Sequence, residues 1–351
     1  MYRNIGCAVG YSGTNYGPRH DLCHKPGDSG LNPAFRKLKS VAGLAGIVLI
    51  AILVSPHARD GSNIFLQAGN LTDVLRQVSV VGIIALAMTY VILTAGIDLS
   101  VGSTLALATS LVAMFVARPG PANLFLHALL AVGIAAGASA LVGVVNGVTI
   151  SALRIPPFIV TLASMIGIRG LAKWLTNNEN IDIGFGSDAA ARFADFVNSK
   201  MVILGTFALL AVVFWVVLER TVFGRYVRAI GDNEKAGMYT GLPIRRVKIW
   251  VYALAGLLTG IAGVLYAAEN HQGNPNAGVA YELDAIAAVV IGGASLAGGS
   301  GSIGGTVIGT LIMGILTNIL RLKNVDSNVE MMVKAVIIVL AVAIQKSGKK
   351  A

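Results

Sequence analysis

The sequence predicts an all-α fold, a polytopic transmembrane helical bundle of about 10 spans, and three observations carry this prediction. Only 13% of the 351 residues are charged, against about 25% in ordinary soluble domains, and the mean hydropathy is +0.74. Apolar runs of membrane-crossing length recur along the chain. The cations gather between these runs, which explains the net charge of +10 better than nucleic-acid binding does.

Residues 1–40 are rich in Gly, Asn, Pro, His and charge and show no apolar period, so we expect a mostly disordered cytoplasmic N-terminal tail. Its Cys7 and Cys23 are the only cysteines of the chain. Their spacing to the neighbouring histidines matches no standard zinc pattern, and no metal site is expected. A transmembrane domain follows over 41–345, and residues 346–351 form a cytoplasmic C-terminal tail.

Ten apolar runs define the expected spans, at 41–54, 74–95, 99–117, 124–151, 158–175, 201–218, 249–268, 286–297, 303–320 and 331–344. A span needs about 20 residues at a rise of about 1.5 Å each, so the eighth is short and is expected to be re-entrant or broken. An even number of spans places both termini on one side. The two tails and the segment 220–248 hold most of the 27 cations, which makes that side cytoplasmic.

The segment 220–248 is the longest basic interruption between two spans, with seven cations against Asp232 and Glu234. A short helix over 233–240 is expected inside it. Asp232 is a suitable N-cap, Glu234 complements the helix dipole, and Gly241 suits the C′ position. Two interpretations remain open, a solvated turn or a docking helix that receives force from a cytoplasmic partner.

Two breaks interrupt the apolar pattern, at 96–103 and 292–305, and we expect broken helices at both. Irregular backbone at membrane depth is tolerated only where protein or a water-filled cavity covers it, and paired interrupted helices indicate a central pathway. Asp98 or Ser100 could instead cap the third span, and Asn146 could join helices. The candidate pathway residues are Asp98, Ser100, Asn146, Ser295, Gly298 and Gly299.

Glycines in the second half of the chain recur every four residues, and we expect them to bring helices close together: Gly256 and Gly260, then Gly301, Gly305 and Gly309. The spacing Gly299-x-Gly301-x-x-Gly304 formally matches a dinucleotide fingerprint. No soluble strand precedes it, however, and no acidic residue follows near position 320, so we reject that interpretation.

Catalytic and nucleotide-binding motifs are absent from the sequence: G-x-x-x-x-G-K-[ST], H-E-x-x-H and G-x-S-x-G do not occur. Charges inside the expected spans are almost confined to Asp98, with Arg169 and Lys173 near the outer end of the fifth. Ion-driven carriers usually depend on such groups, so their scarcity favours an external motor. We therefore expect no enzyme activity and no cofactor in this chain.

Five separated motifs occur in a fixed order: GIDLSVGS at 96–103, NG at 146–147, IPPFIVTLASMIGIRGLA at 155–172, GRYVRAIGDNEKAGMYTGLPIRRVK at 224–248 and YELDAIAAVVIGGASLAGGSGSIGGTVIGT at 281–310. With these motifs the chain resembles the permease subunits of bacterial ABC importers for monosaccharides, the ribose/xylose/galactose type related to branched-chain amino-acid permeases. The likeness spans about residues 41–345 and does not include the first 40 residues.

The resemblance implies a permease for a small neutral sugar, a pentose or hexose, in the bacterial inner membrane. It implies three partners: an ATP-binding subunit that carries ATP and Mg²⁺, a periplasmic sugar-binding protein, and a second permease copy, identical or paralogous. It also implies that the coupling loop docks in the ATPase through Gly231, Asp232, Asn233, Glu234, Ala236 and Gly241.

The alternatives lie within and outside transport. A related permease could carry a branched-chain amino acid, a nucleoside or a signal sugar. A stand-alone secondary carrier would work without ATP. An integral membrane enzyme acting on lipid would need clustered catalytic residues, whereas the five histidines are scattered along the sequence.

Overall fold

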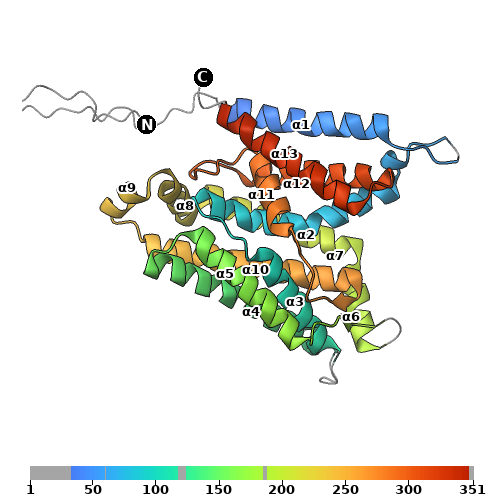
Figure 1. Ribbon diagram of the computed structural model, residues 1–351, viewed down its shortest axis with the longest axis horizontal. Helices are drawn as coiled ribbons and strands as arrows, with labels where there is room; N and C mark the ends of the chain where they lie inside the picture. The colour runs from blue at the N-terminus through green and yellow to red at the C-terminus, as the bar shows by residue number, and fades with distance from the viewer. Residues whose placement is uncertain (1–32, 60, 118–123, 185–187, 348–351) are drawn as a thin grey trace, which may run out of the picture.

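The computed structural model describes residues 33–59, 61–117, 124–184 and 188–347. This part of the chain is built from α-helices, with one 3₁₀ turn and one pair of two-residue strands, which confirms the predicted all-α helical bundle (Figure 1). Helix α1 (Pro33–Val54) begins before residue 41, so the predicted tail is helical over its last residues. The rest of that tail, with Cys7 and Cys23, lies outside the described residues.

Every expected span overlaps a helix, although α11 (Tyr281–Ile291) covers only the first half of the expected span 286–297. Six helices are long and apolar enough to cross a membrane: α2 (Ala68–Leu93), α4 (Leu124–Leu153), α5 (Pro157–Leu175), α7 (Lys200–Arg220), α10 (Ile244–Asn270) and α12 (Ile303–Leu322). The other four expected spans correspond to α1, α3 (Val101–Val116), α11 (Tyr281–Ile291) and α13 (Ser327–Ser347). The number of true crossings stays a prediction, because α3 and α11 are short.

Helices α2 and α10 lie at the centre of the bundle and are buried along most of their length. Hydrogen bonds join α2 to α12 near both ends, between Thr89 and Thr306 (2.7 Å) and between Asn70 and Asn318 (2.9 Å). The outward faces of α4, α5 and α7 expose large apolar side chains, such as Leu209. Such faces suit contact with lipid.

The glycine rows bring helices together as predicted. A Cβ at Gly260 of α10 would lie 2.8 Å from the Cα of Ala136 in α4, and one at Gly256 would meet the backbone of Ser139. In the same way, Gly309 of α12 lies against the backbone of α11. Backbone contact of this kind lets van der Waals packing hold helices together where lipid gives no hydrophobic driving force.

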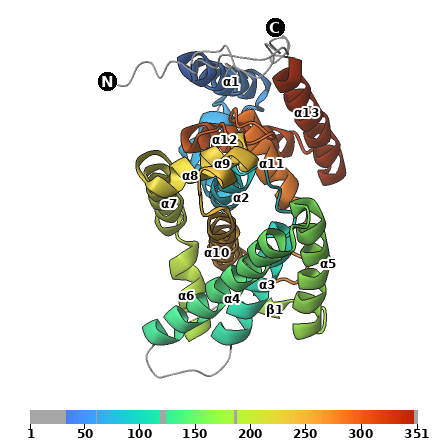
Figure 2. The same ribbon diagram turned by 90° about the vertical axis from the view of Figure 1, so that its left-hand side faces the viewer.

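The two ends of the bundle differ in structure. The start of α1, the end of α13, α8 (Val222–Asp232) and α9 (Glu234–Tyr239) lie at one end (Figures 1 and 2). The 3₁₀ turn η1 (Ile64–Leu66), α6 (Ala189–Asn198) and the antiparallel pair β1 (Ile181–Asp182) and β2 (Gln272–Gly273) lie at the other. The coupling segment thus shares its end with both ends of the described chain, which agrees with the predicted even number of crossings.

Candidate coupling segment and polar sites

The predicted coupling loop contains two helices rather than one. The first of them, α8, was not predicted and follows α7 directly. Its N-cap is Thr221, whose Oγ1 accepts from the Gly224 backbone N–H at 3.3 Å. Its apolar residues Phe223, Val227 and Ile230 recur at i, i+4 and i+7 and pack on the core. This helical spacing is visible in the sequence, but the segment was interpreted by its many cations instead of by its apolar residues.

Helix α9 confirms the predicted short helix but corrects its cap. Asp232 belongs to α8, so the first extended residue is Asn233, whose Oδ1 accepts from the Ala236 backbone N–H at 3.0 Å. Glu234 lies in the first turn as predicted and pairs with Lys248 Nζ at 2.7 Å. Gly241 has a φ of 78°, the left-handed conformation expected at a C′ glycine.

Helix α9 exposes two large apolar side chains beside the charged Glu234 and Lys235. Tyr239 is 85% exposed and Met238 is 57% exposed, in a helix of six residues at the end of the bundle. Large exposed apolar side chains of this kind occur at protein interfaces, where aromatic residues and methionine are enriched. Tyr239 and Met238 are thus candidate contacts for the docking interpretation, which stays a prediction.

The end of α8 touches both broken helices. A Cβ at Gly231 would lie 1.8 Å from the Leu93 carbonyl oxygen and 2.4 Å from the Gly299 backbone nitrogen. The Gly299 N–H donates to that same Leu93 carbonyl at 3.0 Å. A Cβ at Gly299 would also collide with the Asp232 carboxylate. Two predicted coupling residues and the predicted pathway glycines are therefore in direct contact, which the sequence did not indicate.

Three predicted pathway residues form one buried cluster at the α2–α3 break. Asp98 Oδ1 accepts from the Ser100 backbone N–H at 2.9 Å and from the Ser100 hydroxyl at 2.6 Å. Asn146 of α4 donates from Nδ2 to the same hydroxyl at 3.0 Å. Each of the three residues is 2% exposed. Asn146 joins two helices as predicted, whereas neither Asp98 nor Ser100 caps α3 through its side chain, because Asp98 bonds the amide of the N-cap residue Ser100 itself.

The other three predicted pathway residues form a tight turn at the α11–α12 break. The Ser295 N–H donates to the Ser300 carbonyl at 2.8 Å, and the Gly298 N–H donates to the Ser295 carbonyl at 2.9 Å. Gly298 and Gly299 have φ values of 92° and 72°, which glycine adopts without strain. A Cβ at Gly298 would lie 3.0 Å from that of Ala95, so the two breaks meet there.

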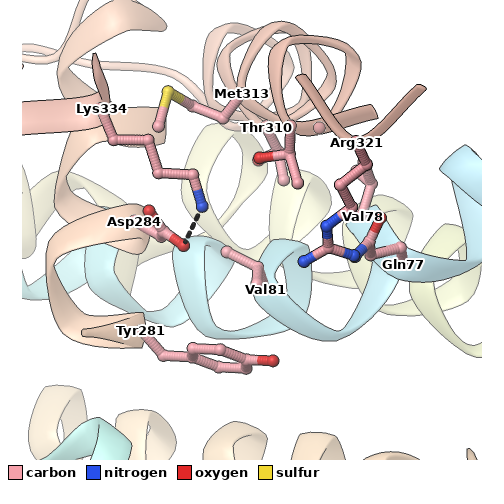
Figure 3. A pocket seen from close by; sticks show the side chains of 11 residues that line it. Gln77, Val78, Val81, Tyr281, Asp284, Thr310, Met313, Arg321 and Lys334 are labelled. Carbon is pink, nitrogen blue, oxygen red and sulfur yellow. Dashed lines mark hydrogen bonds and ion pairs between the residues drawn. The ribbon is translucent and has the colours of Figure 1, made fainter. Parts of the chain in front are cut away.

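A polar cavity that sequence analysis missed lies between α2, α11, α12 and α13 (Figure 3). Asp284, Arg321 and Lys334 line it. The expectation that Asp98 is nearly the only charge inside the spans had omitted Lys334. One signal was present, because Lys334 lies within the expected span 331–344 and follows Glu330 by one helical turn. Its partner Asp284 is distant in sequence, so only the fold reveals the pair.

Comparisons with known proteins agree with this architecture. The family described as "Branched-chain amino acid transport system / permease component" matches residues 70–342. The chain is 42% identical to the ribose import permease protein RbsC of Escherichia coli K12 over 87% of this chain and 92% of that protein. It is 41% identical to the ribose import permease protein RbsC of Bacillus subtilis, over 89% and 93% of the two chains.

A more distant relative is the xylose transport system permease protein XylH of Haemophilus influenzae, which is 35% identical over 90% of this chain and 99% of its own length. No solved structure matches the chain. The matched region runs from the first turn of α2 into α13, and it contains both breaks, the coupling segment and the cavity residues. The chain belongs to the family of permease components typified by branched-chain amino acid transport systems.

Proposed function

We propose that the chain is the permease subunit of an ATP-driven importer that moves a small neutral sugar, a pentose or hexose, across the bacterial inner membrane. The names of the relatives support this class of cargo, because they include import permeases for ribose, xylose and fructose. The sequence contains no phosphate-binding loop, which supports hydrolysis of ATP and binding of Mg²⁺ on a separate subunit.

The contact of Gly231 with Leu93 and Gly299 is the observation that carries the proposed mechanism. The ATP-binding subunit docks on α9, with Tyr239 and Met238 in the interface. Closure of that subunit on ATP displaces α9 and α8 together. Because interlocked backbone deforms little, the displacement reaches the ends of α2 and α12, where both breaks lie. The breaks then open the route for the sugar.

The sidedness of the chain follows from this docking. The end of the bundle with α8 and α9 faces the cytoplasm, where the ATP-binding subunit lies, and both termini are on that side. The periplasmic sugar-binding protein docks at the opposite end, near α6 and the paired strands. A second permease copy, identical or paralogous, completes the assembly and supplies the other wall of the route.

The test of cargo measures uptake in cells that express the chain with its neighbouring transport subunits. We expect labelled D-ribose, D-xylose or D-fructose to accumulate, and excess unlabelled sugar to compete. Accumulation of labelled leucine with no sugar uptake would show that the cargo is a branched-chain amino acid, the class named by the family description.

The test of docking uses Tyr239→Ser. Loss of a large exposed aromatic anchor from an interface typically costs about 2 kcal/mol or more, so we expect co-purification of the ATP-binding subunit to fall at least about tenfold. Val279→Ser is the matched control, since Val279 is 69% exposed but lies next to α11, away from α9. Equal co-purification of the two variants would contradict docking on α9.

A further inference from the structure

The cavity between α2, α11, α12 and α13 is lined by charged groups of three helices, Asp284 of α11, Arg321 of α12 and Lys334 of α13 (Figure 3). Lys334 Nζ lies 3.1 Å from Asp284 Oδ2 and 3.0 Å from Glu330 Oε1. Glu330 Oε2 in turn lies 3.5 Å from Arg321 Nε. Lys334 is about 10 Å along α13 from its first residue, at a rise of about 1.5 Å per residue. The network therefore runs inward from Arg321, which is 57% exposed in the last turn of α12, to Lys334, which is 16% exposed.

Asp284, Glu330 and Arg321 lie at helix ends where their charges complement the helix dipoles, but this does not account for the burial of the Lys334 pair. The side chains of Lys334 and Asp284 are 16% and 18% exposed, and that of Glu330 is 7% exposed. Removing such ions from water costs several kcal/mol each, and apolar residues of similar size hold helices together as well or better. Ionisable groups inside a membrane bundle therefore mark functional sites.

The chemistry of the cavity fits an uncharged polyol. Two carboxylates and two cations pair with one another, so the network is neutral and leaves no unpaired charge for an ionised ligand. A sugar hydroxyl donates and accepts at once, so it can donate to Asp284 while it accepts from Lys334. The Thr310 and Thr317 side chains and the Tyr281 ring complete a wall of mixed polar and aromatic groups, as ligand pockets usually have.

The fourth wall, α13, contacts the bundle through these ion pairs and through Ile338, which packs against the core. It packs against α11, and Figure 2 shows it beside that helix at the side of the bundle. The Lys334–Asp284 pair is a polar link between α13 and α11. A ligand hydroxyl that enters between Lys334 and Asp284 replaces their direct contact by one hydrogen bond to each of them. Binding of the ligand and the position of α13 are therefore coupled.

We propose that this cavity is a binding site for a neutral pentose or hexose inside the permease, held by Asp284, Lys334, Thr317 and Tyr281. The inference rests on the proposed function and adds to it a place where the sugar pauses between the binding protein and the breaks. It also assigns a role to charges that the coupling mechanism does not use.

Protection of a cysteine tests binding directly. Thr317→Cys is made in the full-length chain with Cys7 and Cys23 changed to Ser, co-purified with its partner subunits, and labelled with a small methanethiosulfonate reagent. At D-ribose, D-xylose or D-fructose concentrations about ten times the Kd, we expect one of these sugars to slow labelling about tenfold. Lys323→Cys, at an exposed turn outside the cavity, is the control and should label at one rate throughout.

Three outcomes of the labelling would overturn the proposal. Equal rates at Thr317→Cys with and without every sugar would show that none binds there. Protection by leucine instead of a sugar would assign the cavity to another class of ligand. Absence of labelling without sugar would show that the cavity is closed to water and therefore to a sugar.

Uptake separates failure of this inference from failure of the proposed function. Thr317→Leu fills the cavity, and we expect it to lower the maximal rate of sugar uptake at least tenfold while the ATP-binding subunit still co-purifies. Thr149→Leu on α4, away from the cavity, should transport normally. If the unmodified chain imports no sugar, the proposed function fails. If it imports sugar and Thr317→Leu imports equally well, only the site inside the cavity is refuted.

Discussion

Gly231→Ala is the sharpest perturbation of the contact between the coupling segment and the breaks. The added methyl would lie 1.8 Å from the Leu93 carbonyl oxygen, where ordinary van der Waals contact starts near 3.4 Å. The two nearest atoms, the Leu93 carbonyl oxygen and the Gly299 nitrogen, belong to the backbone and cannot rotate away as a flexible side chain can. Helix α8 must therefore move away from the end of α2. Overpacking of this kind typically costs about 1–3 kcal/mol.

This strain energy predicts a loss of transport if it weakens the coupling between α8 and the breaks. If the strain of about 1–3 kcal/mol falls on the state in which α8 pushes on the breaks, uptake falls by a factor of about 5–150. The ATP-binding subunit should still co-purify, because α9 is unchanged. The assay therefore measures ATP hydrolysis and sugar uptake in the same proteoliposomes, and we expect hydrolysis to continue while uptake falls.

Gly304→Ala is the matched control for this change. Gly304 lies in the same part of the structure, in the first turn of α12, and a Cβ there would meet nothing within 4 Å. We expect normal uptake from it. Equal uptake by Gly231→Ala and Gly304→Ala would refute the reasoning that α8 transmits force through backbone contact.

Three further changes test single interactions. Asn233→Ala removes the cap of α9 and should lower helix stability by about 1 kcal/mol, seen as a lower apparent affinity for the ATP-binding subunit in a titration. Glu234→Gln should change that affinity by less than about 1 kcal/mol, because the Glu234 side chain is 53% exposed in its pair with Lys248. Ser100→Ala removes the hydroxyl that both Asp98 and Asn146 contact. We expect the free energy of unfolding of the detergent-solubilised protein, measured by denaturation, to fall by about 1–3 kcal/mol. An unchanged value would contradict the importance of that cluster.

The helices were largely predictable, because the length of each apolar run and the recurrence of glycines every four residues are features of local sequence. Each apolar run appears as a helix, and Gly256 and Gly260 lie at the contact with α4 as expected. The cap of α9 moved by one residue, because α8 runs to Asp232 and makes Asn233 the first extended residue. Local rules place such boundaries poorly when two helices follow one another directly.

The sites were less predictable, because they depend on contacts between distant segments. Asp98 and Ser100 are neighbours in sequence, yet nothing local shows that Asn146 meets them. The pair of Asp284 with Lys334 required the fold as well. Their charges were visible, but a charge near the end of an apolar run is normally at the membrane surface, and only packing showed that these point inward.

The most direct test of the account is sugar accumulation in proteoliposomes that contain the chain, its ATP-binding subunit and its sugar-binding protein. The account predicts that a labelled pentose or hexose accumulates against its gradient only when ATP is supplied on the side of α8 and α9. Accumulation without ATP, or with ATP supplied only at the opposite end of the bundle, would contradict it.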